Sequence, residues 1–384
     1  MRAVVVLLCS ACSFHRGDAL EPTADAPPDM RVYMDAPAST AVKVLLTLHN
    51  NTRNEALTDF PVLVALDPTR IDYSVCAPGG GDLRFFADDD ATPLSYEIES
   101  WQPGAKSAVW VRVPSIPALT DANIWMHYGD PAATTTATPS AVWSSEHVVV
   151  WHLGDDPGSG AADAVKDSTS RAHHGTSTAQ LDATRVIAGE IGNALQFHAV
   201  ANPGFECVLA AASADFTLPT YTWTAWFYGT SAPVTASGGN LEPVSNGDVG
   251  FNFAWNHNQA AFTAAAAHRD LNVWGSETVG PTNITAATWY HIAATYDGSQ
   301  LCSYLDGASK GCVTLGTPLP PNGSFSIGGP NGTTGCSFGT FDGRMDEMRV
   351  ATVARSQLRL QAEYLTEADL PASPFVTFGT PQKP

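Results

Sequence analysis

Short apolar or alternating runs, separated by Pro, Gly and Asp, recur from Val42 to the end of the chain and constrain its fold more than any other feature. The first set of runs comprises Val42–His49, Phe60–Asp67, Asp82–Ala87, Leu94–Trp101, Ala108–Val113 and Asn123–Tyr128. Short, evenly spaced strands with turn residues between them are typical of antiparallel sandwiches and barrels. The segment Pro131–Ser140, rich in Thr, Ala and Pro, interrupts this pattern and predicts a boundary between two domains.

A second set of strands follows the boundary. Val148–Leu153 is a continuous apolar run, which predicts a strand buried on both faces. Tyr221–Tyr228 carries bulky residues on both faces and fits a central strand of two stacked sheets. Further predicted strands are Gly250–Trp255, Thr288–Tyr296, Leu301–Leu305, Gly311–Leu315, Phe325–Gly328, Arg344–Val350 and Phe375–Phe378, and one helix is predicted over Ser356–Leu365. The predicted fold class is therefore all-β, with a first antiparallel sandwich over 42–131, a linker over 132–141 and a second sandwich over 142–384.

The N-terminal segment has the features of an export signal. Met1 and Arg2 precede the apolar run Ala3–Leu8, and small residues lead to Cys12. Bacterial lipoprotein signals place the thiol that receives lipid directly after the cleavage point, so we expect residues 1–11 to be removed and Cys12 to carry lipid. Ordinary secretion with cleavage nearby is the alternative. Residues 12–41, rich in Pro, Ala, Asp and Thr, predict a disordered tether.

The charge balance excludes one class of partner. The chain has 38 acidic and 19 basic residues, a formal net charge of −19, so nucleic acid and anionic lipid surfaces would be repelled. After the signal, no stretch has the roughly 18 consecutive apolar residues of a membrane-spanning helix. Membrane attachment is therefore expected only through lipid at Cys12, which would hold the protein in the bacterial cell envelope or at the cell surface. Without lipidation, the protein is expected to be secreted.

The cysteines predict an oxidising compartment. Removal of Cys9 with the signal and lipidation of Cys12 leave Cys76, Cys207, Cys302, Cys312 and Cys336, an odd number that implies a free thiol. We predict a disulfide between Cys302 and Cys312, because a three-residue loop from Asp306 to Ala308 would place them directly opposite on adjacent strands. The alternatives are that Cys336 or Cys207 takes one of these partners, or that all five thiols are free.

Several segments carry a resemblance to known families. The first domain resembles a bacterial domain of unknown function, DUF2341, through Phe60–Val64, Gly81–Phe85, Leu94–Trp101 and Val109–Pro114. The second resembles a laminin-G-like jelly roll, related to concanavalin A-like lectins and glucanases. That resemblance rests on Val150–Leu153, Asp167–Thr169, His174–Thr176, Gly192–Phe197, Thr222–Phe227, Trp289–Gly298, Tyr304–Gly307 and Phe341–Val350. It implies a jelly roll over about 145–379.

The resemblance implies a cell-surface binding protein whose jelly roll recognises glycan or extracellular protein partners. An enzyme that acts on polysaccharide and a purely structural envelope protein are the alternatives. It also implies a structural Ca²⁺ ion held by Asp346 together with Asp155 or Asp167, since calcium prefers several oxygen ligands on a pinned loop. The competing interpretation is that Asp346 caps a turn and that Asp155 only solvates a loop.

The sequence does not predict a catalytic site. Glu97 and Glu99 lie two residues apart on one strand face, as a glycosidase pair could, but the Glu-x-Asp-x-x-Glu strand of jelly-roll glucanases is absent. We therefore interpret both as a solvent-facing polar stripe. There is no Gly-x-Ser-x-Gly nucleophile turn either. His152, His174 and His291 are expected to be packed or hydrogen-bonded histidines rather than bases.

Overall fold

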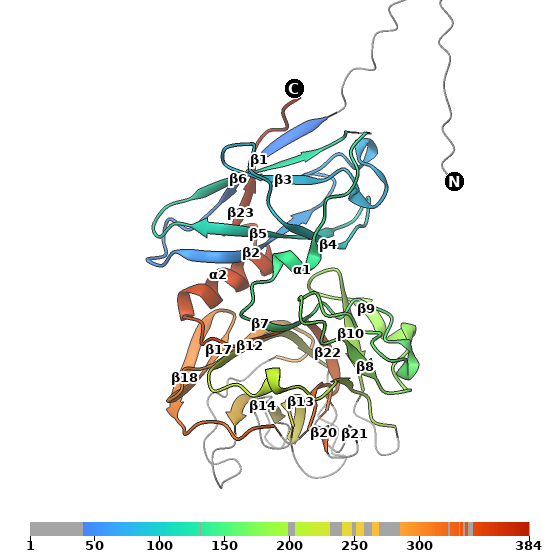
Figure 1. Cartoon of the computed structure of the whole chain (residues 1–384), viewed down its shortest axis with the longest axis vertical. Helices are drawn as coiled ribbons and strands as arrows, with labels where there is room; N and C mark the ends of the chain where they lie inside the picture. Colours follow the sequence, from blue (N-terminus) through green and yellow to red (C-terminus); the bar gives the residue numbers. More distant parts are fainter. Residues whose placement is uncertain are drawn as a thin grey trace, which may run out of the picture. The chain divides into compact units, whose positions relative to one another are not determined.

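The computed structural model describes residues 41–383 except 131, 199–203, 231–239, 248–250, 257–262, 269–284, 322, 330, 333–334 and 337–340. The predicted signal, Cys12 and the tether lie outside these residues. Ser39–Pro384 forms one compact unit, and its described part is built mainly of antiparallel sheets (Figure 1), which confirms the all-β prediction. Among the described helices, none has both the length and the apolar character that crossing a bilayer requires.

The first sandwich contains two sheets. One has the order β23 (Val376–Phe378), β1 (Val42–Leu48), β6 (Ala122–Tyr128) and β3 (Arg84–Ala87), and the other has the order β2 (Leu57–Leu66), β5 (Ser107–Ile116) and β4 (Tyr96–Ser100). Alternate residues of β1 are buried, as expected for a strand with one face on a core. In contrast, β2 is buried on both faces over its second half, because its outer face contacts the rest of the molecule.

The second sandwich also contains two sheets. The first has the order β18 (Ala308–Thr314), β17 (Gln300–Leu305), β16 (Trp289–Tyr296), β12 (Tyr221–Gly229), β22 (Gly343–Ala351), β10 (Asn193–Phe197) and β9 (Val186–Ala188), and β7 (His147–Trp151) also pairs with β22. The second has the order β15 (Thr263–His268), β14 (Phe251–Asn256), β13 (Asn240–Asn246), β19 (Phe325–Ile327), β11 (Val208–Ala210) and β8 (Gly175–Ser177). β20 (Asn331–Gly332) pairs with β21 (Gly335–Cys336). Short 3₁₀ turns lie at Tyr73–Val75, Pro78–Gly80, Gly158–Gly160, Ala183–Arg185 and Ala214–Phe216.

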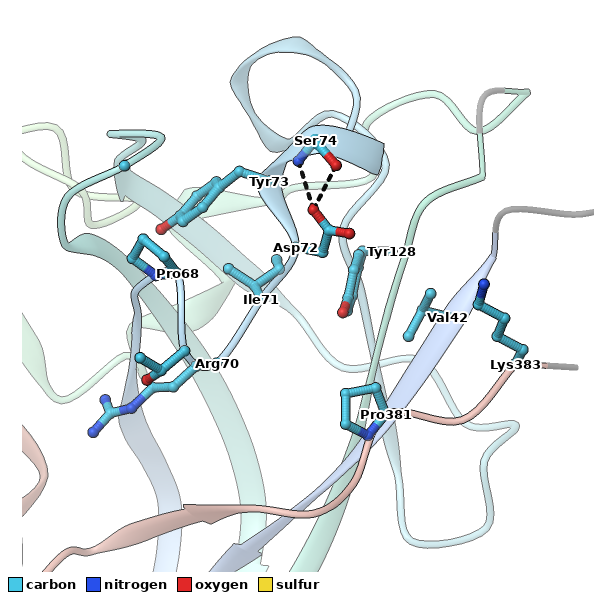
Figure 2. Close-up of a pocket in the computed structure, with 12 residues that line it drawn as sticks. Val42, Pro68, Arg70, Ile71, Asp72, Tyr73, Ser74, Tyr128, Pro381 and Lys383 are labelled. Carbon is cyan, nitrogen blue, oxygen red and sulfur yellow. Dashed lines mark hydrogen bonds between the residues drawn. The ribbon is translucent and has the colours of Figure 1, made fainter.

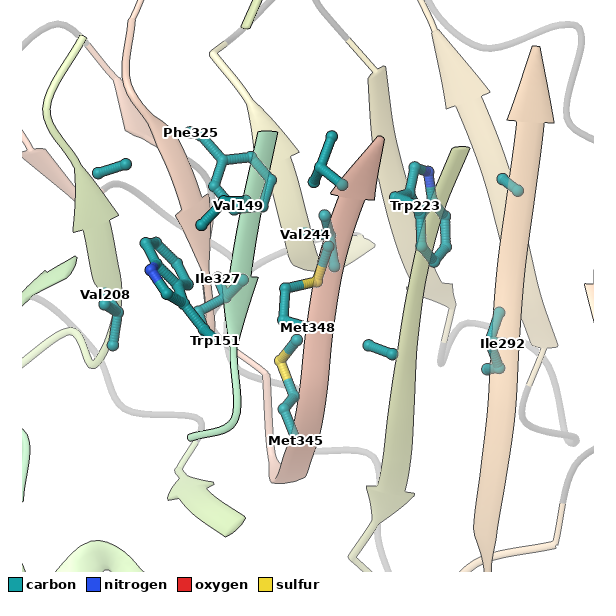
Figure 3. Packing of buried hydrophobic residues seen from close by; sticks show 14 of the residues in the cluster. Val149, Trp151, Val208, Trp223, Val244, Ile292, Phe325, Ile327, Met345 and Met348 are labelled. Atoms are coloured by element: carbon teal, nitrogen blue, oxygen red, sulfur yellow. The ribbon is translucent and has the colours of Figure 1, made fainter. Parts of the chain in front are cut away.

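One apolar core lies between the sheets of the second sandwich (Figure 3). As predicted, alternate residues of β12 face this core, Trp223 among them. Trp226 faces the other side, where its Nε1 donates a hydrogen bond to Glu367. Met345 and Met348 of β22 both point into the core although they are three residues apart, an odd spacing that a regular strand does not allow. β22 is therefore irregular between them.

The end of the chain returns to the first sandwich. β23 pairs with β1, with Thr377 opposite Thr47, and Phe375 packs in the first core. The predicted range 142–384 for the second domain therefore differs from the structure at its end. The alternation of side chains in Val376–Phe378 is compatible with an edge strand in either sandwich. The sequence therefore did not reveal that this strand pairs with β1. The predicted linker also differs, because the short helix α1 (Pro139–Val142) lies there.

The helix α2 (Gln357–Ala368) connects the two sandwiches (Figure 1). Ser356 caps its first turn by accepting a hydrogen bond from the Arg359 N–H. Leu360 packs against Ala293 and Tyr304 of the second sandwich. Six residues further along α2, the Thr366 hydroxyl accepts a hydrogen bond from the Leu63 N–H of β2. α2 thus contacts β2 on one side and the outer face of the β16–β17 pair on another.

The structure joins Cys302 to Cys312 and Cys207 to Cys336, and leaves Cys76 as a free thiol. Cys302 and Cys312 lie directly opposite each other, with Cα atoms 4.1 Å apart. The predicted three-residue loop is wrong, however, because Leu305 pairs with Ala308 and the turn holds two residues. A bulge between Ser303 and Tyr304 in the pairing supplies the extra residue that restores the register.

Candidate functional site

β4 carries two glutamates that were predicted to face solvent, and this prediction is wrong. Glu97 is 7% exposed and the Glu99 side chain 5% exposed. Glu97 accepts hydrogen bonds from Trp143 Nε1 at 2.8 Å and from Ser168 Oγ at 2.6 Å; Trp143 precedes β7 of the second sandwich and Ser168 follows it. The face of β4 that looked solvent-exposed in the sequence is covered by the neighbouring sandwich.

His152, which follows β7, lies among three carboxylates. Its Nδ1 is 2.7 Å from Glu347 Oε1 and 3.6 Å from Glu99 Oε2, and its Nε2 is 3.4 Å from Glu97 Oε2. Burial alone would lower the pKa of His152, but the three carboxylates, Glu347 first, hold it well above its usual value. The expectation of a packed, hydrogen-bonded histidine agrees with this position.

A bulge in β22 supplies the other acidic groups. Trp226 of β12 lies opposite Asp346, whereas Thr224 lies opposite Arg349, so β22 has one more residue than β12 in this interval. Glu347 adopts the left-handed conformation with φ of 53°. Because Met345 and Met348 both face the core, the bulge turns the consecutive residues Asp346 and Glu347 away from it. Strain of this kind at a non-glycine residue often marks functional sites.

Arg349 links this group to α2. Its guanidinium donates to Glu347 Oε2 at 2.5 Å and to Glu367 Oε1 at 2.6 Å. It also lies over the Trp110 ring, at 4.4 Å from the centroid, and over the Trp143 ring at 5.0 Å. Burial by itself would raise the pKa of Glu347, but His152 and Arg349 lower it to about 2.

The pKa values of the remaining three carboxylates are shifted in opposite directions: those of Glu99 and Asp346 are raised and that of Glu97 is lowered. Burial and the nearby Glu347 raise the pKa of Glu99 well above its usual value, although Trp110 Nε1 donates a hydrogen bond to it at 2.8 Å. Burial, followed by the charges of Glu347 and Glu99, likewise raises the pKa of Asp346. Burial opposes ionisation of Glu97 too, but His152 and the hydrogen bonds of Ser168 and Trp143 outweigh it and lower its pKa.

A cavity of about 250 Å³ lies beside this cluster. Its lining residues are Glu97, Ile98, Glu99, Ser100, His152, Gly154, Asp155, Lys166, Ser168 and Asn193. A larger cavity of about 570 Å³ in the first sandwich (Figure 2) shares none of them. Its carboxylate, Asp72, is already engaged by the N–H and hydroxyl of Ser74. The first cavity is therefore the one that brings several buried ionisable groups together.

The residues predicted to bind calcium do not fit that ion as a set. Both oxygens of Asp167 are occupied, because they accept hydrogen bonds from the N–H groups of Val150, Thr169 and His173 and from the Thr169 hydroxyl. Asp155 lines the cavity and accepts a hydrogen bond from the Lys166 N–H. Asp346 is instead close to Glu347, in the cluster described above. Asp167 thus shapes a turn, and the calcium ligand set remains a prediction without a converged site.

Two other predicted histidines are packed, as expected. His174 Nδ1 accepts a hydrogen bond from the Asp167 N–H at 2.9 Å. His291 is 1% exposed and its ring makes an edge contact with Trp226, with Nε2 at 3.8 Å from Glu367 Oε2. The sequence analysis missed Glu347, Arg349 and Glu367. The four ionisable residues among the seven of 344–350, in a strand that also carries Met345, Met348 and Val350, were the signal that could have indicated a buried polar site in β22.

Comparisons with known families agree with this architecture. Residues 79–158 match the family model of a domain of unknown function, DUF2341, and residues 206–361 match that of the concanavalin A-like lectin/glucanases superfamily. The two matches occur in the predicted order, the DUF2341 model first and the concanavalin A-like model after it. The first match extends beyond residue 131 and includes β7 and His152, while the second includes Glu347 and Arg349. Both matched regions thus contribute to the buried cluster.

None of the curated proteins compared with the chain matches it. Among solved structures, the binding domain of Paraclostridial Mosquitocidal Protein 1 is similar at 10% identity and a TM-score of 0.43, over 58% of this chain and 52% of that one. Domain 4 of an extracellular arabinanase from Geobacillus stearothermophilus, in complex with arabinotriose, has 14% identity and a TM-score of 0.40, over 56% and 97% of the two chains. The chain spans about half the length of the first of these. At these TM-scores the similarities carry no argument about function.

Proposed function

We propose that the chain is an exported binding protein of the bacterial cell surface, anchored by lipid on Cys12, whose concanavalin A-like domain binds a glycan or a protein. The observation that carries this proposal is the match to the concanavalin A-like lectin/glucanases superfamily over residues 206–361. Two disulfides, Cys302–Cys312 and Cys207–Cys336, support an oxidising compartment outside the cytoplasm.

The packing of the second sandwich limits where a ligand binds. Trp226, on the outer face of β12, donates a hydrogen bond to Glu367 of α2, and Ala293 of β16 packs against Leu360. This face is therefore unavailable to a partner. Ligand contacts are expected on the opposite sheet or on the loops at its ends.

One such loop region contains a cavity of about 320 Å³. Its lining residues are Phe216, Thr217, Leu218, Pro219, Asn246, Thr317, Pro318, Leu319 and Pro320. Asn246 is 2% exposed; its Nδ2 donates to the Phe216 carbonyl, while its Oδ1 has no hydrogen-bond partner within the described structure. A mostly apolar wall with one free acceptor is typical of a small-ligand subsite, and a sugar hydroxyl or a peptide N–H could donate to that acceptor.

The chain is proposed to bind rather than cleave its ligand. Glu97 and Glu99 are the carboxylates that a glycosidase-like reaction would need. Both already accept hydrogen bonds from tryptophan N–H groups, and both contact His152. These contacts favour a role in joining the two sandwiches over a role in protonating a substrate.

The binding proposal is tested with the full chain on a glycan array and in pull-down from surface extracts. For a ligand found in this way, Leu319→Asp should weaken binding at least about tenfold, because it places a charge in an apolar subsite. Leu119→Asp is the matched control, since Leu119 is 56% exposed in the first sandwich. Reducing-sugar release from polysaccharides would instead support an enzyme, and equal affinity of the two variants would reject the subsite.

The lipid anchor has its own test, because Cys12 lies outside the described residues. Cys12→Ala should move the protein from the membrane fraction to the soluble fraction, since the acidic chain has no attraction to anionic lipid. An unchanged membrane pool would count against lipidation.

A further inference from the structure

Glu99, His152 and Glu347 bring three metal-ligating side chains to one point of the structure. Their ligand atoms all lie within 4.8 Å of one another. His152 Nδ1 is 2.7 Å from Glu347 Oε1 and 3.6 Å from Glu99 Oε2. Zinc bonds of about 2.0–2.2 Å place neighbouring ligand atoms roughly 3–4 Å apart, so small side-chain adjustments would suit such an ion.

A buried atom without a partner lies next to this group. Asp346 is 0% exposed; its Oδ2 accepts a hydrogen bond from the Ile191 N–H at 2.9 Å, but its Oδ1 has no partner within the described residues. Asp346 directly precedes Glu347 in the β22 bulge, which turns both away from the apolar core of the second sandwich. An unsatisfied buried carboxylate oxygen costs free energy, and a cation would satisfy it.

The charges around the cluster do not balance. Four buried carboxylates, those of Glu97, Glu99, Asp346 and Glu347, face the cationic groups of His152 and Arg349. Arg349 is also shared with Glu367 of α2. Four negative groups against two positive ones leave an excess of negative charge in a site from which water is largely excluded. Burial of unpaired charge is expensive, so the site favours protons or a bound cation.

We propose that Glu99, His152 and Glu347, with Asp346 as a further oxygen ligand, bind one divalent transition-metal ion such as zinc. The imidazole ligand selects this class over calcium, which prefers six to eight oxygens. Glu99 belongs to β4 of the first sandwich, whereas the other ligands belong to the second. The ion would thus connect the two sandwiches. Of the predicted calcium set, Asp346 belongs to this site and Asp155 lines the adjoining cavity, whereas both oxygens of Asp167 are engaged in a turn.

The test uses the untagged full chain, stripped with chelator and then dialysed against zinc chloride. Metal content by mass spectrometry should reach one zinc per chain, and zinc should raise the melting temperature because it binds only the folded state. Cobalt in place of zinc should give the visible absorption of a bound ion with nitrogen and oxygen ligands. Calcium alone should produce neither effect.

Glu99→Gln and His152→Gln should each weaken zinc binding at least about tenfold and abolish the rise in melting temperature. Glu99→Gln removes one of several like charges, so the apo protein should fold. Glu363→Gln is the matched control, because Glu363 is a buried glutamate of the same region that pairs with Arg355 and Arg359 instead. It should retain one zinc per chain. Absence of zinc binding by the wild type, retention of binding in both ligand variants, or binding of calcium in its place would overturn the proposal.

Discussion

At the scale of single residues, Arg349 supplies a buried positive charge between the sandwiches. Its two hydrogen bonds to Glu347 and Glu367 connect β22 to α2, and its stacking on Trp110 adds contact with β5. A protein with a buried ion pair of this kind is often no more stable than one in which apolar residues replace both partners. Loss of one partner is much more costly, because it leaves the other charge buried and unpaired.

We therefore predict that Arg349→Met lowers the free energy of unfolding by about 3–5 kcal/mol. The thioether side chain fills part of the space, but it removes the guanidinium from Glu367 and leaves Glu347 with His152 alone. Lys106→Met is the control, because Lys106 is 55% exposed and its ion pair with Asp369 should contribute less than about 1 kcal/mol. Urea unfolding of both variants measures the difference. Similar losses in the two variants would contradict the assigned role of Arg349.

His147 gives the protein a defined pH dependence. It is 1% exposed, and its Nε2 lies 2.7 Å from Arg355 Nη2. Burial, followed by the charge of Arg355, lowers the pKa of His147 well below 6.5 in the folded state. Below pH 6.5 the unfolded chain takes up a proton at His147, whereas the folded protein does not. The free energy of unfolding is therefore unaffected by His147 above pH 6.5 and decreases as the pH falls below it, by up to about 1.4 kcal/mol per pH unit.

His147→Gln should remove this dependence. As the pH falls below 6.5, the free energy of unfolding of the wild type should decrease more steeply than that of the variant. Urea unfolding at a series of pH values measures both slopes, and equal slopes would show that His147 does not remain neutral in the folded protein.

At the scale of elements, the hairpin of β17 and β18 depends on its contact with α2. A Cβ atom at Gly307 would lie 2.7 Å from the Cα of Gln361 in α2, and φ at Gly307 is 72°. Gly298 occupies a comparable Asp-Gly turn, with φ of 101°, but there a Cβ would meet only the Thr220 methyl at 3.9 Å. The two glycines therefore share the conformational requirement and differ in packing.

Replacement of each glycine by alanine separates these two effects. Gly298→Ala should cost about 1–2 kcal/mol from the left-handed conformation alone. Gly307→Ala should cost about 1–3 kcal/mol more, because the methyl group also pushes α2 away from the hairpin. Chemical unfolding of the two variants gives the comparison, and a cost at Gly307 no larger than that at Gly298 would argue against tight packing of α2 there.

The sequence predicted the regular elements well and their irregularities poorly. The alternation of Tyr221–Tyr228 identified a central strand and its core face, because side chains alternate strictly in a regular strand. The bulges in β22 and in the β17–β18 pairing were not visible in the sequence, since an extra residue in one strand depends on the pairing with its neighbour. For this reason the Cys302–Cys312 register was reached through a bulge instead of the predicted loop.

The buried cluster was harder still to predict. Glu97 and Glu99 have the spacing of an exposed polar stripe, and only the contact with the second sandwich makes that stripe internal. Asp346 was identified from a family resemblance, but its neighbours Glu99 and His152 lie far away in the sequence. Local patterns carry no information about which two outer faces pack together, so a site built by such packing requires the structure.

At the scale of the whole molecule, the first sandwich is completed by residues from both ends of the described chain. β1 lies beside β23, and Phe375 packs against Phe60 with ring centroids 5.6 Å apart. Between these ends, α2 and the buried cluster join the first sandwich to the second. The two sandwiches therefore share enough buried contact to be expected to unfold together.

Calorimetry of the full chain should show one unfolding transition, with equal calorimetric and van't Hoff enthalpies. Deletion of residues 371–384 removes β23 and takes Phe375, which is 2% exposed, out of the first core. Loss of a buried phenylalanine costs about 3–5 kcal/mol, so the first sandwich should then melt earlier and a separate transition should appear. Deletion of residues 383–384 alone leaves β23 intact and serves as the control. Two transitions in the full chain would contradict this coupling, and so would an unchanged melting curve after the longer deletion. Either result would mean that β23 and the junction do not hold the sandwiches in one cooperative unit.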